Sequence, residues 1–195
     1  QRDIMSDDER GLVYKVTVIG DGAVGKTSLI KKFTKGEFNE QYIMTMGAQF
    51  TQYQTKVSGT PLDLVFWDIA GQESFAKLRP NFYQGSSAAI IVFSHEENDH
   101  GEKSFKNIIK WLDDIKKNCG RLPIMLFGNK VDLVGNIDSI MKNKENPKSN
   151  YNVDVLMKGY NFLGYYLTSA LTGQGVNQAF NVLANKLFQI YKNFA

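Results

Sequence analysis

The sequence predicts an α/β domain with a six-stranded, mostly parallel sheet, one antiparallel edge strand and about five flanking helices. Apolar runs of strand length recur along the chain, and near-continuous apolar strands are typical of parallel sheets buried on both faces. Segments with apolar residues at helical spacing separate most of these runs, and such alternation indicates an α/β sheet with helices on both sides. The length of 195 residues suits one domain.

Five apolar runs are expected to form parallel strands: 12–20, 62–68, 88–94, 123–129 and 163–169. A sixth strand should precede the second run, because the stretch QFTQYQTKVSGTPLDLVFW contains no helical pattern. Its centre, Ser58–Pro61, is rich in turn-forming residues. We therefore predict a hairpin that adds one antiparallel strand.

Three segments are expected to be helical. The first, TSLIKKFTKG, follows the first strand and ends at a glycine. The other two place apolar residues on one helical face: Phe105, Ile108, Ile109, Leu112 and Ile115 in the first, and Val176, Phe180, Leu183, Leu187 and Ile190 in the second. The Asn- and Lys-rich stretch 134–152 is expected to form a surface insertion with one short helix, and its simplest interpretation is a tolerated loop.

Composition excludes several classes of protein. The net charge of +3 is too small to indicate a nucleic-acid partner, and one cysteine, Cys119, allows neither a disulfide framework nor a cysteine zinc site. His95 and His100 show no metal-ligand pattern and are expected to be ordinary surface residues. Residues 1–11 are interpreted as a flexible extension without the apolar core of a secretory signal. No run reaches transmembrane length, so we expect a cytoplasmic protein.

The stretch Gly20–Thr27 (GDGAVGKT) fits the phosphate-loop pattern G-x-x-x-x-G-K-[ST] between a strand and a helix. Its glycines let backbone N–H groups approach an anion, and the helix that follows adds its positive end. Lys26 is expected to contact the β- and γ-phosphates, and Thr27 to ligate Mg²⁺. The loop alone leaves kinases, ATPases and GTPases open.

A second motif favours guanine. FGNKVDL closes a strand and supplies Asn129, Lys130 and Asp132. A carboxylate at Asp132 can accept from guanine N1–H and the 2-amino group, whereas adenine would leave it unpaired at a cost. Asn129 can tie this loop to the phosphate loop, and the Lys130 stem can cover the base. Further on, Ser169–Ala170 offers a backbone N–H for guanine O6.

Two further segments are expected to sense the γ-phosphate. In LVFWDIAGQESF, Asp68 can reach Mg²⁺, Gly71 can approach the γ-phosphate and Gln72 can orient the attacking water. Upstream, Thr45 is placed to contact Mg²⁺ and the γ-phosphate together. Both segments would be held by the phosphate and released after hydrolysis.

With these motifs in order, the sequence resembles the Ras superfamily of small GTPases over about residues 12–195. The resemblance implies a P-loop NTPase G domain that binds GTP or GDP with Mg²⁺. It implies Gln72, Lys26 and Thr45 as catalytic residues, and Thr27, Thr45 and Asp68 at the metal. It implies nucleotide contacts from these positions: Asp21, Gly22, Ala23, Val24, Gly25, Lys26, Thr27, Ser28, Phe38, Tyr42, Thr45, Gly71, Asn129, Lys130, Asp132, Ser169, Ala170 and Leu171.

The motifs disagree about the branch of the superfamily. TMGAQF, FYQGSSA and N-K-x-D are similar to Rab proteins, whereas Leu78–Pro80 and SALTGQG are similar to Rho proteins. The 36 residues between Asp132 and Ser169 are more than most of the superfamily has, and Ser94–Phe105 is also long. Met44 stands where proline is usual, and Leu171 where lysine is common. The balance favours a divergent Rab-like protein in vesicle trafficking, with a Rho-like signalling GTPase as the alternative.

Three hypotheses are therefore carried forward. The first is a slow GTP-hydrolysing switch, a monomer that binds an exchange factor, an activating protein and effectors through switch I (37–50) and switch II (68–83). The second is a nucleotide-binding scaffold with little hydrolysis. The third is a nucleotide or small-molecule kinase, which the few arginines disfavour because a kinase lid needs several. Membrane association on the cytosolic face would require a lipidated tail, and no nucleic acid is expected.

Overall fold

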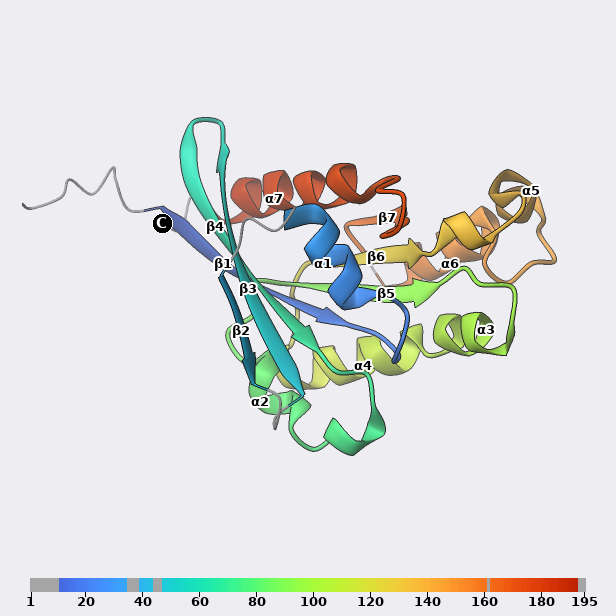
Figure 1. Cartoon of the computed structure of the whole chain (residues 1–195), viewed down its shortest axis with the longest axis horizontal. Coiled ribbons are helices and arrows are strands. Elements are labelled where there is room, and N and C mark those ends of the chain that lie inside the picture. Colours follow the sequence, from blue (N-terminus) through green and yellow to red (C-terminus); the bar gives the residue numbers. More distant parts are fainter. Residues whose placement is uncertain (1–10, 35–38, 44–46, 161, 193–195) are drawn as a thin grey trace, which may run out of the picture.

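Seven strands form one sheet in the order β2-β3-β4-β1-β5-β6-β7 in the computed structural model (Figure 1). The structure describes residues 11–34, 39–43, 47–160 and 162–192, with the backbone alone for 39–43. The strands are β1 (Leu12–Ile19), β2 (Asn39–Ile43), β3 (Ala48–Val57), β4 (Thr60–Ile69), β5 (Ala88–Ser94), β6 (Ile124–Asn129) and β7 (Gly164–Leu167).

The strand pairing confirms the predicted α/β class. Strands β4, β1, β5, β6 and β7 run parallel, and β3 pairs antiparallel with β4. The edge strand β2, antiparallel to β3, is a seventh strand that the sequence did not predict. Its five residues, NEQYI, include three polar side chains, so no apolar run marked it. The antiparallel strand β3 consequently lies one position in from the edge.

The β3–β4 hairpin forms where the sequence predicted a turn. Ser58 and Gly59 connect the strands, with φ of 52° and 84°. Two successive residues with positive φ are the requirement of the tight hairpin turn that matches strand twist. Glycine accepts this conformation without strain, which explains its place at the second turn position.

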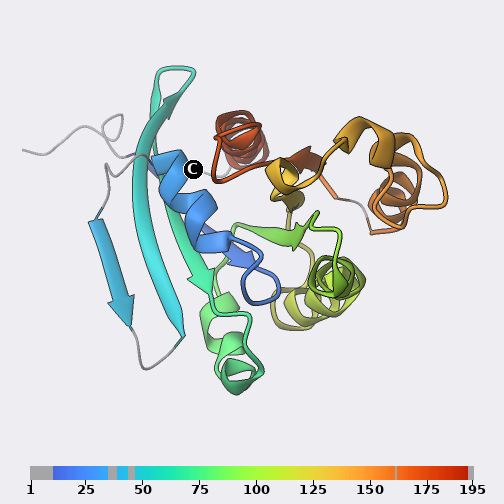
Figure 2. The same ribbon diagram turned by 45° about the vertical axis from the view of Figure 1, so that its right-hand side comes forward.

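Helices cover both faces of the sheet and bury two hydrophobic layers (Figures 1 and 2). Helices α1 and α7 pack on one face, where Phe33, Phe66 and Phe180 meet. Helices α2 and α4 pack on the other, where Leu112 and Ile115 are fully buried. The helices are α1 (Lys26–Thr34), α2 (Arg79–Tyr83), α3 (Asp99–Lys106), α4 (Ile108–Cys119), α5 (Ile137–Lys142), α6 (Asn150–Tyr160) and α7 (Val176–Tyr191).

Two of these regions differ from the predicted five helices. The segment predicted as one helix divides at Asn107, which ends α3 and begins α4. The stretch predicted to hold one short helix contains α5 and leads into α6, and Figure 2 shows both at the end of the molecule far from β2. The described part of the chain thus has seven α-helices and two short 3₁₀ turns, η3 (Glu73–Phe75) and η4 (Val131–Leu133).

The carboxyl ends of the parallel strands position the motifs together. The phosphate loop follows β1, Asp68 is the penultimate residue of β4, Asn129 ends β6, and Ser169 follows β7. In open α/β sheets, ligands bind at this edge where the strand order reverses, which here is at the central strand β1. Among the described residues, no helix has the length and apolarity needed to cross a membrane.

Candidate nucleotide site

The phosphate loop wraps around the amine of its own lysine. Lys26 Nζ donates to the carbonyl oxygens of Gly20 at 2.9 Å and Asp21 at 2.8 Å. Burial lowers the pKa of Lys26, while the carboxylates of Asp68 and Asp21 oppose that shift. A buried ammonium that donates to two backbone carbonyls is suited to bind an incoming polyphosphate.

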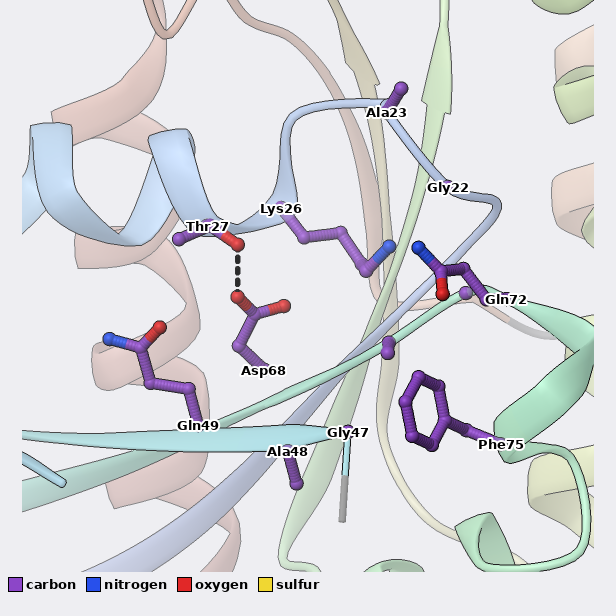
Figure 3. A pocket seen from close by; sticks show the side chains of 12 residues that line it. Gly22, Ala23, Lys26, Thr27, Gly47, Ala48, Gln49, Asp68, Gln72 and Phe75 are labelled. Atoms are coloured by element: carbon purple, nitrogen blue, oxygen red, sulfur yellow. Dashed lines mark hydrogen bonds between the residues drawn. The ribbon is translucent and has the colours of Figure 1, made fainter. Parts of the chain in front are cut away.

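A cavity of ≈ 350 Å³ opens beside this amine (Figure 3). In the figure, the Lys26 side chain extends across the cavity toward the Gln72 side chain. The cavity is lined by residues of the phosphate loop, β3 and the start of switch II: Gly22, Ala23, Lys26, Thr27, Gly47, Ala48, Gln49, Asp68, Ala70, Gly71, Gln72 and Phe75. Of these, Gly47, Ala48, Gln49, Ala70 and Phe75 were not predicted as site residues.

The donor set in this cavity suits a hard cation. The Thr27 hydroxyl donates to Asp68 Oδ2, and Figure 3 draws this bond. Burial raises the pKa of Asp68, and the hydrogen bond from Thr27 and the charge of Lys26 oppose it. Hydroxyl and carboxylate oxygens are ligands that Mg²⁺ prefers, together with substrate phosphates. Within the described ranges, no three His, Cys, Asp or Glu side chains gather in a way that could hold a metal.

The start of switch II packs tightly on the phosphate loop. A Cβ placed on Gly71 would lie 2.3 Å from the Gly20 carbonyl oxygen and 2.5 Å from Gly22 N, so no side chain fits there. Arg79 holds the other side, since its Nη2 donates to the carbonyls of Gly71 at 3.3 Å and Gln72 at 2.8 Å. The expected water-orienting residue is therefore placed through its backbone by a buried arginine.

Asn129 joins the base loop to the phosphate loop. Its Nδ2 donates to the Val24 carbonyl at 2.9 Å, and its Oδ1 accepts from Thr168 Oγ1 and from the Ala170 N–H, each at 3.2 Å. The close approach explains Gly25, because a Cβ there would lie 2.3 Å from Asn129 Nδ2. The Ala170 N–H, predicted to meet guanine O6, is bonded to Asn129 in this structure.

A second cavity of ≈ 400 Å³ lies over the base loop. Asp132 Oδ1 accepts from the Ser169 hydroxyl at 2.5 Å, which fixes the carboxylate at the cavity wall. Leu171 also lines this cavity, with 76% of its surface exposed. The cavity is lined by Gly25, Ser28, Asn129, Lys130, Asp132, Leu133, Ala170 and Leu171.

Lys130 adopts a backbone conformation that is rare for its type. Its φ is 63°, in the left-handed region, and such strain in a non-glycine residue is concentrated at functional sites. Its Nζ donates to Glu96 Oε2 at 2.8 Å. That hydrogen bond, with help from Ser94 and His100, lowers the pKa of Glu96 to about 2 against the opposing effect of burial.

Three predicted contacts cannot be placed. Phe38 and Thr45 lie outside the described residues, and the side chain of Tyr42 also lies outside them. The predicted extension 1–11 is described only at Gly11. These assignments remain predictions.

His95 corrects the sequence analysis, and His100, whose side chain is 37% exposed, makes a contact that was not predicted. His95 is fully buried rather than at the surface, and its Nε2 bonds the Tyr165 hydroxyl at 2.7 Å. His100 reaches the phosphate loop, with Nε2 at 2.9 Å from the Gly22 carbonyl. Neither contact has a local sequence signal, because each partner is 70 or more residues away.

Helix α4 supplies a further contact that sequence patterns did not predict. Trp111 Nε1 donates to Asp21 Oδ1 and Asn107 Nδ2 to Asp21 Oδ2, both at 2.7 Å. The face of the Trp111 indole stacks on the Arg79 guanidinium, 4.4 Å from the ring centre. Trp111 thus contacts both the phosphate loop and the arginine that holds switch II.

Comparison with known proteins agrees with this geometry. A family model described as the Ras family matches residues 15–189. The chain is 35% identical to the GTP-binding protein RHO1 of Saccharomyces cerevisiae, over 85% of this chain and 79% of the relative. It is 32% identical to the Ras-related protein Rab-21 of Geodia cydonium (90% and 71% covered) and 34% identical to the GTP-binding protein YPT53 of S. cerevisiae (90% and 77%).

The chain therefore belongs to the Ras superfamily of small GTPases. Relatives with Rho, Rab and Ypt names match at similar identity, so the comparisons leave its branch open.

Proposed function

We propose that the protein is a Mg²⁺-dependent molecular switch that binds GTP or GDP, hydrolyses GTP slowly and binds partners according to the nucleotide. The observation that carries this proposal is the bridge from Asn129 to Val24, which places the cavity over Asp132 and the cavity beside Lys26 on either side of one loop. A nucleotide needs two neighbouring cavities of this kind, because its base and its polyphosphate are joined by a ribose.

In this proposal the residues divide between binding and hydrolysis. The backbone N–H groups of 22–28 and Lys26 bind the phosphates, and Asp132 selects guanine. Thr27 and Asp68, with Thr45, would hold Mg²⁺, which neutralises phosphate charge when bound. Gln72 orients the attacking water, and the carbonyl contact from Arg79 keeps its backbone near the phosphate loop.

Slow intrinsic turnover follows from the placement of the arginines. Of the two arginines in the described residues, Arg79 is buried against Trp111, and Arg121 lies before β6 at the opposite sheet edge. Neither extends into the phosphate cavity. We therefore infer that an activating partner supplies the arginine that stabilises the transition state.

Two variants test the proposal. Asp132→Asn should shift preference from guanine to xanthine nucleotides, because the new amide donates where the carboxylate accepted; unchanged guanine binding would place Asp132 away from the base. Gln72→Leu should slow single-turnover hydrolysis while GTP binding persists. Equal rates for wild type and variant, even with a cognate activator, would favour the scaffold hypothesis.

Within the superfamily we propose a Rab-like role in vesicle trafficking, supported by the N-K-x-D motif and the resemblance of FYQGSSA to Rab sequences. The Rho-like alternative is supported by Leu78–Pro80, by SALTGQG and by the insertion between Asp132 and Ser169, which contains helix α5. Imaging of the natural protein in its own cells separates the two. Gln72→Leu protein on vesicle membranes supports the Rab-like role, and accumulation with cortical actin supports the Rho-like role.

A further inference from the structure

The first turn of helix α3 carries a histidine whose two ring nitrogens both face acceptors. His100 Nε2 lies 2.9 Å from the Gly22 carbonyl oxygen, and Nδ1 lies 3.1 Å from Glu96 Oε2. A carbonyl oxygen and a carboxylate only accept hydrogen bonds, and a neutral imidazole has one N–H. Both contacts exist together only when the ring carries two protons.

The carboxylate partner is held in its charged form. Glu96 Oε2 also accepts from Lys130 Nζ at 2.8 Å and from the Ser94 hydroxyl at 2.9 Å. Its lowered pKa, caused first by the Lys130 bond, keeps it ionised near neutral pH. A neutral His100 would therefore keep its one proton on Nδ1 toward Glu96, and its Nε2 lone pair would then face the Gly22 oxygen.

The Gly22 carbonyl matters because of the N–H on the same peptide. In a planar trans peptide the C=O of Gly22 and the N–H of Ala23 point in opposite directions. A donor on the carbonyl consequently fixes where the Ala23 N–H points. Ala23 also has φ of 59°, a left-handed conformation that costs energy in a residue with a Cβ and that forms part of anion-binding backbone concavities.

The insertion supports this segment from the other side. Lys148 lies between α5 and α6, is buried, and donates through Nζ to the carbonyls of Glu96 at 2.7 Å and His95 at 3.2 Å. The two long segments that the sequence analysis singled out, 94–105 and 134–152, are therefore in contact. Together they form a connected path from the insertion through Glu96 and His100 to Gly22.

We propose that His100 is a positioning residue of the phosphate loop: in its doubly protonated form it bridges Glu96 to the Gly22 carbonyl, aims the Ala23 N–H at the phosphates and slows nucleotide release. Loss of the proton breaks the bridge, so release accelerates as pH rises. The inference rests on the proposed nucleotide site.

The charged groups around the ring are Glu96, Lys130 and Lys148, with Asp21 in the loop and the neighbours Glu97, Asp99, Glu102 and Lys103.

The test measures release of a fluorescent GDP analogue over about pH 5.5 to 8.5, which brackets the ordinary titration of histidine. Because a hydrogen bond from a charged donor corresponds to roughly a tenfold change in an equilibrium constant, wild-type release should accelerate by about that factor across the range. His100→Gln should release GDP faster at low pH and show a flat profile. Asp99→Asn, a charge change on the neighbouring exposed residue, should keep the wild-type profile.

Glu96→Gln gives a sharper second variant. The new amide can donate to Nδ1 of a neutral His100, so Nε2 keeps its proton for Gly22 at every pH. The absolute rate will change because Lys130 loses its ion pair, but the pH dependence of release should disappear. Circular dichroism and thermal melting check that each variant is folded.

Nitrogen-15 NMR of the His100 ring provides a readout independent of release. We expect protons on both ring nitrogens while the bridge is in place, and the remaining proton on Nδ1 once the bridge is lost. A ring that carries a single proton across the whole range, or a release profile identical in wild type and His100→Gln, would overturn the inference. If wild-type protein binds no guanine nucleotide at any pH, the proposed function fails instead, and the NMR measurement on the free protein still tests the bridge.

Discussion

Trp111 Nε1 donates a hydrogen bond to Asp21 Oδ1 at 2.7 Å, so helix α4 is bonded directly to the phosphate loop. The indole is 3% exposed, and its face stacks on the Arg79 guanidinium, which binds the carbonyls of Gly71 and Gln72 in switch II. The Trp111 side chain thereby contacts the phosphate loop and the arginine that holds switch II, the two elements that the proposed switch must keep in place relative to each other.

Replacing Trp111 with Phe should remove the hydrogen bond to the phosphate loop while an aromatic ring stays packed at this position. The loss of an N–H bond to a carboxylate should lower the free energy of unfolding by ~2 kcal/mol and speed GDP release several-fold. Urea unfolding and stopped-flow release measure the two effects. Trp67→Phe is the matched control, since Trp67 packs on Phe50 and Phe82 away from the loop. Equal release rates in both variants would show that the Asp21 bond is dispensable.

Removing the Asn129 amide should affect both cavities. Asn129→Ala leaves the Val24 carbonyl without its donor. It also removes the acceptor of the Thr168 hydroxyl and of the Ala170 N–H. We expect the free energy of unfolding to fall by about 2–4 kcal/mol and guanine nucleotide affinity to fall at least tenfold. Titration calorimetry and urea unfolding provide the measurements.

Thr168→Val gives the graded comparison for Asn129. It removes one of the three bonds and keeps the shape of the side chain, so its cost should be about 1 kcal/mol with affinity nearly retained. A Thr168 variant as damaging as Asn129→Ala would contradict the central position that we assign to Asn129.

Adding a methyl group at Gly71 should push switch II off the phosphate loop. The new Cβ would lie 2.3 to 2.5 Å from backbone atoms of residues 20–22, which cannot yield as a flexible side chain would. We expect faster hydrogen exchange of the amides in 70–79 and slower GTP hydrolysis. Gly22→Ala is the comparison for exchange, because its Cβ meets no atom within 4 Å. Unchanged exchange in Gly71→Ala would mean that the close approach does not persist in solution.

The buried His95 should make the fold sensitive to mild acid. Burial, assisted by the charge of Lys148, lowers the pKa of His95 from 6.5 to about 3. The unfolded chain therefore takes up the proton first, and the free energy of unfolding should fall as pH drops from 6.5 toward 3, by about 2 kcal/mol between pH 6.5 and 5. Glu96 acts in the same direction, but only below its unfolded value of 4.5.

Urea unfolding at pH 7, 6 and 5 measures that loss. The double variant His95→Leu/Tyr165→Phe removes the titrating ring and its hydroxyl partner together, so no polar group is left unpaired. It should unfold with a much flatter dependence on pH. A slope as steep as that of the wild type would assign the acid sensitivity to other groups.

Much of the fold was predictable because its signals are local. The apolar runs of β1, β4, β5 and β6, the Ser58–Gly59 turn and the glycine pattern of the phosphate loop each depend on residues adjacent in sequence. The edge strand β2 was missed because an edge strand need not be apolar. The division of the helix at Asn107 was missed because the apolar spacing continues across it.

The candidate site was predictable only where a motif carries it. The pattern G-x-x-x-x-G-K-[ST] and N-K-x-D located the cavities around Lys26 and Asp132. The contacts of Asp21 with Trp111 and of Gly22 with His100 join residues 90 and 78 positions apart, and no local pattern encodes them. Such pairs are set by how the helices pack on the sheet.

The break at Asn107 has a consequence for how such a domain can change over time. Helix α4 holds Trp111 in its hydrogen bond with Asp21. Helix α3 is a separate helix on the other side of the break, so a change of length in the preceding segment can be accommodated there. Residues can then be gained or lost ahead of Asn107 without rotating α4 against the sheet. The sequence of α3 can therefore diverge during evolution and place different side chains over the phosphate loop, while α4 and the loop keep their positions.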